Sequence, residues 1–249
     1  VYESRNSINP INSYSSDDYF GFLEDEEGLW IENKEGNHSL EIGIGRLPVK
    51  TKEEAKNITD KIIRYASHER MYGSWKNNIT YVADDGDANL HQRAAEDLAD
   101  YFDKFQPQTR LTKLYIDALP QEVLASRESA LLTREALVNS IDEGTFVIDY
   151  LGHGNENQWA IENIMDATLI NDLNNRYHLP LFLTATCEFG RYDDPSINTS
   201  GAEKLLLNEN GGAIALLTTT RPVYASSNEL VNQAFHRNLF KTENGSFLR

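Results

Sequence analysis

Residues 145–154 have the sequence TFVIDYLGHG, a continuous apolar run that ends in a histidine between two glycines. An apolar run of this length that stops at a glycine is typical of a strand buried on both faces. Three further runs of the same kind are Ile79–Ala83, Leu179–Thr186 and Gly212–Thr218. Helical spacing of apolar residues lies between the runs, and strands that alternate with helices favour a parallel sheet. The sequence therefore predicts an α/β fold, with a mostly parallel sheet flanked by helices.

The segment before the first of these runs has weaker signals. Residues 1–36 are polar and rich in turn-forming residues. Residues Leu40–Leu47 alternate apolar with small or polar residues, which predicts a strand. Thr51 and Glu54 then have the spacing of a capping box, and apolar residues recur behind them at helical spacing. We expect a helix over about Lys52–Ser67.

Two residues that could carry chemistry follow two of the predicted strands. His153 comes after the run that ends at Leu151, and Cys187, the single cysteine of the chain, follows the run that ends at Thr186. Ligands of parallel sheets bind beyond the carboxyl ends of the strands, so the two side chains are predicted to share a rim. A thiol nucleophile needs an acid–base partner and backbone N–H groups aimed at the developing oxyanion, and the N–H groups of Gly154 and Cys187 are candidates. The alternative is a buried cysteine and an incidental histidine in a turn.

The composition excludes several classes of function. Lys and Arg number 23 against 39 Asp and Glu, a formal net charge of −16 that disfavours a nucleic-acid partner. One cysteine allows neither an internal disulfide nor a cysteine-rich zinc site. No run approaches the roughly 18 apolar residues of a membrane span. The chain opens on a polar stretch without a secretory signal, as expected of a segment cut from a longer protein.

The spacing of the histidine and the cysteine resembles that of a known clan. An apolar strand followed by His-Gly, then a second apolar strand followed by Ala-x-Cys, is similar to the caspase-like cysteine peptidases; here 187 − 153 gives a separation of 34. Residues Tyr150–Glu156 resemble the version found in the gingipain family. The closest resemblance is to the PorU-like branch, the C-terminal signal peptidase (sortase) of the bacterial type IX secretion system. Three stretches carry it: Asp17–Leu23, Ala185–Pro195 and Gly211–Arg221.

The resemblance implies a catalytic domain in two parts. Residues 1–76 would form a smaller N-terminal α/β subdomain, and residues 77–249 a caspase-like catalytic subdomain that is truncated at its C-terminus. Cys187 would attack the scissile carbonyl to form a thioester, and His153 would protonate the leaving amine. The acyl group would pass to water or to an amine of surface lipopolysaccharide. The implied location is the bacterial cell surface at the outer membrane, with cargo proteins that carry a C-terminal secretion signal as substrates and other secretion-complex subunits as partners.

The same resemblance suggests roles for further residues. An acidic residue that supports the histidine is expected in the loop after the first core strand, where we favour Asp84 or Asp85 over the other carboxylates. Tyr224 would wall the specificity pocket, and Glu188, beside the nucleophile, is the other candidate substrate-binding residue. No cofactor is required and no metal ligand is assigned, although the loop Asp84–Asp87 could hold the structural calcium known in gingipains. The acids of this loop could equally be a helix N-terminus that suits the macrodipole.

Two other functions stay open at this level. The chain could be a general secreted gingipain-like protease. It could also be a catalytically silent caspase-like domain that binds cargo or a partner subunit, although a binding module has no need to retain both His153 and Cys187.

Overall fold

The computed structural model describes residues 15–24, 27, 39–123, 128–194, 196 and 198–239. Its helices are α1 (Lys52–Ser67), α2 (Gly86–Phe105), α3 (Leu131–Glu143), α4 (Ala167–Asp172), α5 (Gly201–Leu207) and α6 (Ala225–Leu239). The main strands are β1 (Asn78–Ala83), β2 (Arg110–Tyr115), β5 (Val147–Leu151), β6 (Leu181–Ala185) and β7 (Ala215–Thr218). Strands β3 (Glu122–Val123) and β4 (Glu128–Ser129) pair antiparallel in a separate two-stranded sheet, and short 3-10 turns span Asp18–Phe20, Glu69–Met71, Ser74–Asn77 and Ile116–Ala118.

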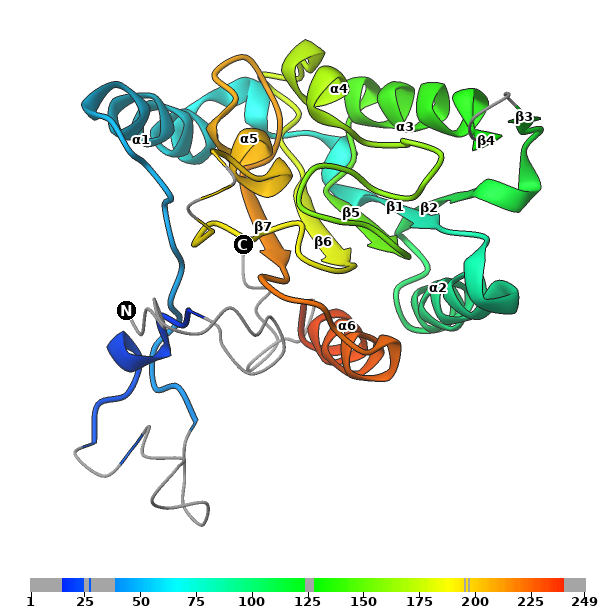
Figure 1. The fold of residues 1–249 in the computed structure, drawn as a ribbon. Helices are drawn as coiled ribbons and strands as arrows, with labels where there is room; N and C mark the ends of the chain where they lie inside the picture. The colour runs from blue at the N-terminus through cyan, green and yellow to red at the C-terminus, as the bar shows by residue number, and fades with distance from the viewer. Residues whose placement is uncertain are drawn as a thin grey trace.

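The five main strands form one parallel sheet with the order β2-β1-β5-β6-β7 (Figure 1). The chain moves from β1 outward to β2 and then returns to the other side of β1 to form β5. The strand order therefore reverses between β1 and β5, and such a switch point is where open α/β sheets bind ligands. This architecture confirms the predicted α/β fold of a sheet flanked by helices.

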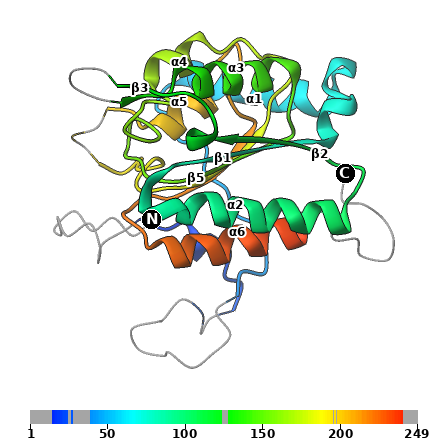
Figure 2. The same cartoon turned by 90° about the vertical axis from the view of Figure 1, so that its right-hand side faces the viewer.

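Helices cover both faces of the sheet, because successive residues of each strand point to opposite sides. In β5, Ile148 and Tyr150 join the core cluster beneath α3, α4 and α5, whereas Val147 and Leu151 join the cluster beneath α2 and α6. Figure 2 shows α2 and α6 side by side on one face, with the other helices opposite. Among the described residues no helix is both long and apolar enough to cross a bilayer.

The predicted helix at Lys52–Ser67 is confirmed as α1, with the reciprocal capping box of Thr51 and Glu54. The predicted strand at Leu40–Leu47 is wrong, because these residues are bends and irregular backbone without a ladder partner. Leu40 and Leu47 are accordingly exposed. A strand needs a neighbour for its backbone groups, and two glycines in this stretch weaken it further.

Helix α1 is attached to the main body through a buried lysine. The Lys61 ammonium donates to the carbonyl oxygens of Leu206 at 2.7 Å and Gly211 at 2.9 Å, next to α5. Burial lowers the pKa of Lys61 to about 7. The described part of residues 1–76 holds helix α1 and short 3-10 turns but no strand.

The division of the chain at residue 76 stays a prediction from the resemblance.

Candidate active site

Strand register brings three loops to one level of the sheet edge. Ala83 of β1 pairs with Leu151 of β5, which pairs with Ala185 of β6. His153 and Cys187 each come two residues after these paired positions. The two side chains that the sequence placed on a shared rim therefore leave adjacent strands at equivalent positions.

The histidine loop lies against the cysteine loop through a glycine. A Cβ atom at Gly154 would lie 2.5 Å from the Oγ1 of Thr186 and 2.8 Å from the carbonyl oxygen of Gln158. Only glycine allows an approach this close. The residue after His153 is thus packed on the residue before Cys187.

The backbone of His153 is held at both ends. Its N–H donates to Oδ2 of the buried Asp84 at 2.8 Å, and its carbonyl accepts from the Tyr150 hydroxyl at 2.6 Å. The Tyr150 ring stacks on the buried Trp159, with 4.4 Å between ring centroids and 2° between the planes. Burial raises the pKa of Tyr150 well above its ordinary value, which keeps the hydroxyl protonated as a donor. These contacts fix the point from which the imidazole projects.

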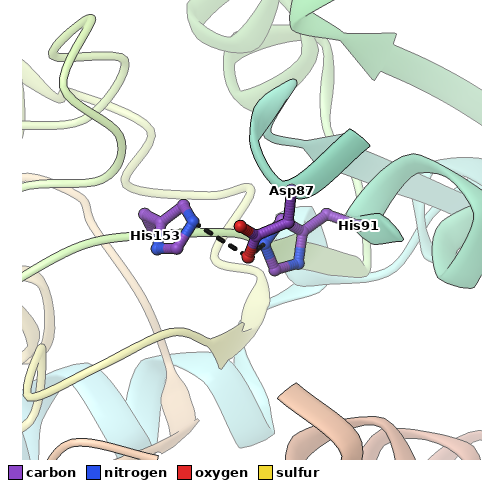
Figure 3. A group of neighbouring side chains, drawn as sticks. All are labelled: Asp87, His91 and His153. Atoms are coloured by element: carbon purple, nitrogen blue, oxygen red, sulfur yellow. Dashed lines mark ion pairs between the residues drawn. The ribbon is translucent and has the colours of Figure 1, made fainter. Parts of the chain in front are cut away.

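The imidazole itself meets a different carboxylate. Nε2 of His153 lies 3.2 Å from Oδ2 of Asp87, and the same oxygen lies 3.6 Å from Nε2 of His91 (Figure 3). The rings of His91 and His153 meet edge to face at 5.3 Å. The side chains of Asp87 and His153 are about half exposed, at 53% and 56%, whereas the side chain of His91 is 11% exposed. Burial lowers the pKa of His91, and the nearby carboxylate of Asp84 opposes that shift.

Asp87 reaches the ring through unusual backbone. Asp87, Ala88 and Asn89 are left-handed, with φ of 54°, 54° and 63°, at the start of α2. Non-glycine residues adopt this region at a cost of about 1–3 kcal/mol each, and such strain clusters at functional sites. The local path, rather than regular helical spacing, therefore carries the Asp87 carboxylate to His153.

The two aspartates that the sequence favoured have other contacts. Asp84 binds the backbone of His153, and Asp85 accepts a hydrogen bond from the Gln121 amide at 2.7 Å. Asp87 was not singled out, because residue spacing cannot show which of three neighbouring acids turns toward a ring. The only sequence signal is Asn89, a residue type that tolerates left-handed backbone.

The cysteine loop is bound to the loop after β7. The Cys187 thiol lies 3.9 Å from the carbonyl oxygen of Val223, and Glu188 N–H donates to the carbonyl oxygen of Arg221 at 3.3 Å. Glu188 itself has a φ of 58°. Within the described part of the chain, the N–H groups of Gly154 and Cys187 have no backbone acceptor. Neither of the two predicted oxyanion donors is therefore used in a hydrogen bond to the backbone of the described residues.

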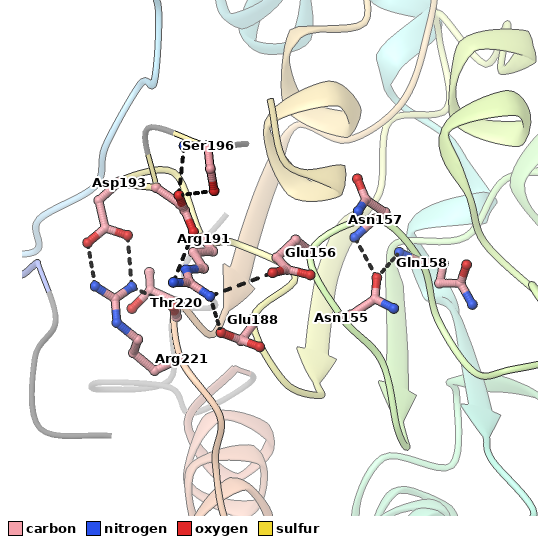
Figure 4. Close-up of polar contacts among 11 residues, drawn as sticks. Asn155, Glu156, Asn157, Gln158, Glu188, Arg191, Asp193, Ser196, Thr220 and Arg221 are labelled. Carbon is pink, nitrogen blue, oxygen red and sulfur yellow. Dashed lines mark hydrogen bonds and ion pairs between the residues drawn. The ribbon is translucent and has the colours of Figure 1, made fainter. Parts of the chain in front are cut away.

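An arginine ties this loop to the histidine loop. Arg191 contacts the carboxylates of Glu188 at 2.6 Å, Asp194 at 2.9 Å and Glu156 at 3.6 Å (Figure 4). The Glu188 carboxylate, a predicted substrate contact, is thus engaged with Arg191. A second pair, Arg221 with Asp193, is bidentate at 2.8 and 2.5 Å.

A small cavity lies under this edge. It measures about 110 Å³ and extends from the ends of β5 and β6 to α2 and α6. Its lining is mostly apolar and comprises Leu90, His91, Ala94, Leu151, Ala185, Ala225, Ser226, Asn228 and Glu229. Tyr224, the predicted pocket wall, is 75% exposed and adjoins the residue whose carbonyl meets the Cys187 thiol.

Among the described residues, two groups of side chains could hold a metal ion. Oxygens of Asp84, Asp85 and Glu162 lie within 4.8 Å of one another, which is a donor set suited to a hard cation such as calcium. Asp117 adjoins this group, and burial together with the charge of Asp85 raises its pKa. The second group is Asp87, His91 and His153. The expected calcium site at the Asp84–Asp87 loop stays a prediction; of that loop, Asp84 and Asp85 belong to the first group and Asp87 to the second.

Comparison with known proteins identifies the family. The family model of peptidase family C25 matches residues 1–248. Gingipain R2 of Porphyromonas gingivalis is 21% identical over 165 residues, which are 63% of this chain and 20% of the relative. Gingipain R1 of the same species is also 21% identical, over 63% of this chain and 15% of the relative.

Solved structures agree in fold. The complex of Porphyromonas gingivalis RgpB pro- and mature domains superposes with a TM-score of 0.71 at 18% identity, covering 92% of this chain and 50% of that one. The Arg-specific cysteine proteinase gingipain R gives a TM-score of 0.68 at 18% identity, over 90% and 49%. This chain thus spans about a fifth or less of the curated relatives and half of the solved chains. The chain belongs to peptidase family C25, as a homologue of the gingipain cysteine proteinases.

Proposed function

We propose that this chain carries the catalytic site of a cysteine endopeptidase, with Cys187 as nucleophile and His153 as acid–base partner. The observation that carries the proposal is the matched register of β5 and β6, from which both residues project two positions beyond a paired residue. The contact of Gly154 with Thr186 supports it, since that contact brings the two loops together.

In the proposed reaction the Cys187 sulfur attacks the scissile carbonyl carbon. The S–C bond forms, the C–N bond breaks, and the thiol proton passes through His153 to the departing amine. Water or an acceptor amine then attacks the thioester carbon, a C–O or C–N bond forms, the S–C bond breaks, and the proton of the attacking group passes through His153 back to the Cys187 sulfur. Asp87 acts as a positioning residue by accepting from Nε2 of the ring, which leaves the other ring nitrogen to serve the thiol.

The developing oxyanion would be bound by the N–H groups of Gly154 and Cys187. Preorganised donors of this kind contribute about 3–4 kcal/mol each to stabilising the transition state. The proposal is supported by the lack of a described backbone acceptor for either group. The packing of Gly154 on Thr186 would hold the two donors at a fixed separation.

The substrate would lie between Tyr224 and the cavity under the strand ends. A cavity of about 110 Å³ with mostly apolar walls suits a small side chain rather than a long one. Glu229, which lines it, accepts from the Gln233 amide at 2.9 Å. We therefore propose a preference for small residues next to the cleaved bond, with Tyr224 covering them.

The finer role we propose is removal of C-terminal secretion signals from type IX cargo at the cell surface. Support comes from the resemblance of the Ala185–Pro195 stretch, which contains Cys187 and in which Arg191 pairs with Asp194. Transfer of the acyl group to a lipopolysaccharide amine belongs to the same proposal, as do partner subunits at the outer membrane.

The test is intact-mass analysis of a signal-bearing cargo protein after incubation with the wild-type chain, Cys187→Ala and His153→Ala. We expect cleavage at one site before the signal domain by wild type alone. Cleavage at many sites would replace the signal-peptidase role with general proteolysis. Cargo binding without cleavage, reproduced with a chain extended at both ends, would contradict the enzyme and favour a silent binding domain.

A further inference from the structure

We propose that Asp87, His91 and His153 form a binding site for a divalent transition-metal ion of the zinc class, and that metal bound there holds the peptidase inactive. The second half of this proposal rests on the role of His153 as the acid–base residue. The first half concerns metal binding alone and can be tested without any catalysis.

Two of the three donor pairs have close to the spacing of a tetrahedral site. Zinc binds histidine nitrogen and carboxylate oxygen at about 2.0–2.2 Å, so two ligand atoms of a tetrahedron lie about 3.4 Å apart. Oδ2 of Asp87 lies 3.2 Å from Nε2 of His153 and 3.6 Å from Nε2 of His91. One ring nitrogen of each histidine and the carboxylate all lie within 4.8 Å of one another. Shifts of a few tenths of an ångström would bring both Asp87–histidine distances to about 3.4 Å. A modest rotation of one imidazole ring would do the same for the distance between the His91 and His153 nitrogens.

His91 is an independent sign of a ligand. The His91 side chain is 11% exposed, and its Nε2 atom is buried without a hydrogen-bond partner, since Oδ2 of Asp87 lies 3.6 Å away. A buried polar atom without a partner costs about 1–3 kcal/mol, and such atoms call for an explanation. This nitrogen is directed at Asp87, the carboxylate that it shares with His153 (Figure 3). A metal ion between the three groups would satisfy it.

The donor types select the class of metal. Two imidazoles and one carboxylate suit zinc and its neighbours, whereas calcium and magnesium take oxygen ligands. The site is also open on one side, because Asp87 and His153 are each about half exposed. Water can therefore fill the fourth position, and the ion can exchange with solvent.

Metal binding here would remove the acid–base function. Nε2 of His153 would be bonded to the ion and its partner Asp87 would become a metal ligand. The other ring nitrogen would then carry the one remaining proton of the ring, so it could neither accept the thiol proton nor pass it to the leaving amine. Removing the ion with a chelator would restore activity, because binding and release of the metal change no covalent bond of the protein.

The binding test uses the Cys187→Ala chain, which removes the thiol as a competing ligand. Isothermal titration with zinc chloride is expected to show one site per chain, and an excess of calcium chloride is expected to leave the isotherm unchanged. Adding His91→Ala or Asp87→Asn should weaken binding at least about 100-fold, since even outer-shell partners contribute about 10–100-fold to affinity. Asn is nearly isosteric with Asp and tolerates left-handed backbone, so the second variant is expected to fold.

The matched control is His68→Ala, a histidine that contacts Tyr177 and belongs to neither group of candidate ligands, and this change should leave the titration as it was. Loss of binding on Cys187→Ala alone would place zinc on the thiol and overturn the proposal. Equal affinity for zinc in the Cys187→Ala chain with and without Asp87→Asn or His91→Ala would also overturn the proposal.

Measurements of peptidase activity with and without zinc then test the proposed inhibition. Zinc should inhibit the wild-type peptidase reversibly, and the ratio of activities without and with zinc should fall toward one in the His91→Ala chain. Unchanged zinc sensitivity in that variant would refute the inhibitory role. If no variant cleaves any substrate, the proposed peptidase fails, while the titrations still decide the metal site.

Discussion

At the residue scale, Asp84 and Asp87 divide two tasks that a single acid could have performed. Asp84 is buried and fixes the backbone of His153, whereas Asp87 is half exposed and meets its ring. A buried carboxylate is suited to holding a peptide N–H, because that contact does not change during a reaction. The exposed carboxylate can respond when the ring gains or loses a proton.

This division predicts that Asp87→Asn slows catalysis more than Asp85→Asn does. An amide stabilises a protonated ring less than a carboxylate does, so we expect kcat to fall about 10–100-fold, a part of the roughly 10²–10⁴-fold that acid–base catalysis contributes as a whole. KM and the melting temperature should change little. Steady-state kinetics on a peptide substrate measures this, with Asp85→Asn as the matched control because Asp85 contacts Gln121 instead. Equal losses in both variants would contradict a specific role for Asp87.

A second prediction concerns Gly154. An added Cβ would lie 2.5 Å from the Thr186 Oγ1 and would push the histidine loop off the cysteine loop. Overpacking of this kind costs about 1–3 kcal/mol, and we expect Gly154→Ala to lower both the free energy of unfolding and kcat. The control is Gly45→Ala, where nothing lies within 4 Å of the added atom. Urea unfolding compares the two, and an unaffected Gly154→Ala would mean that the loops are not tightly packed.

At the scale of helices and strands, the sequence predicts those elements that are determined by local patterns of residues. Apolar runs locate β1, β5, β6 and β7, and the capping box locates the start of α1. The strand expected at Leu40–Leu47 fails because alternation says nothing about whether a neighbour is available for pairing. The rim shared by His153 and Cys187 follows from parallel topology, but the partner of the His153 ring follows from left-handed backbone at Asp87–Asn89, which no periodicity encodes.

Lys61 gives a prediction at this scale. Lys61→Met keeps the volume but leaves the carbonyl oxygens of Leu206 and Gly211 without their donor. An unsatisfied buried group costs about 1–3 kcal/mol, so we expect a lower free energy of unfolding and a weaker attachment of α1 to α5. Lys52→Met, at an exposed position of the same helix, should stay within about 0.5 kcal/mol of wild type. Chemical denaturation that finds the two variants equally stable would contradict this role for Lys61.

At the scale of the whole molecule, a buried polar contact joins the centre of the sheet to α6. Asp149 of β5 accepts from the Asn232 amide at 2.8 Å and lies 2.8 Å from Nε2 of His236. Burial raises the pKa of Asp149 to about 7 and lowers the pKa of His236 to about 4. The folded pair therefore holds one proton between about pH 4 and 6.5 and has no net charge.

The unfolded pair also holds one proton over that range, but on the histidine, since the ordinary pKa values are 3.8 for Asp149 and 6.5 for His236. Stability changes with pH only where the folded and unfolded states bind different numbers of protons. The contributions of the two residues thus cancel between about pH 4 and 6.5. Within this range of about pH 4 to 6.5, the pair holds α6 on the sheet without making its attachment depend on pH.

Replacing either residue of the pair should reveal the pH dependence of the free energy of unfolding that the other residue contributes, and the two dependences should have opposite signs. In Asp149→Asn only the unfolded state binds a proton, on His236, so the free energy of unfolding should rise with pH by up to about 1.4 kcal/mol per unit between about 4 and 6.5. In His236→Gln only the folded state binds one, on Asp149, so the free energy should fall from about pH 4 to 7. Urea unfolding of both variants and wild type at about pH 4.5, 5.5 and 6.5 measures the slopes. Subtracting the wild-type curve removes the contributions of all other groups, so parallel curves would show that Asp149 and His236 do not share a proton in the folded state.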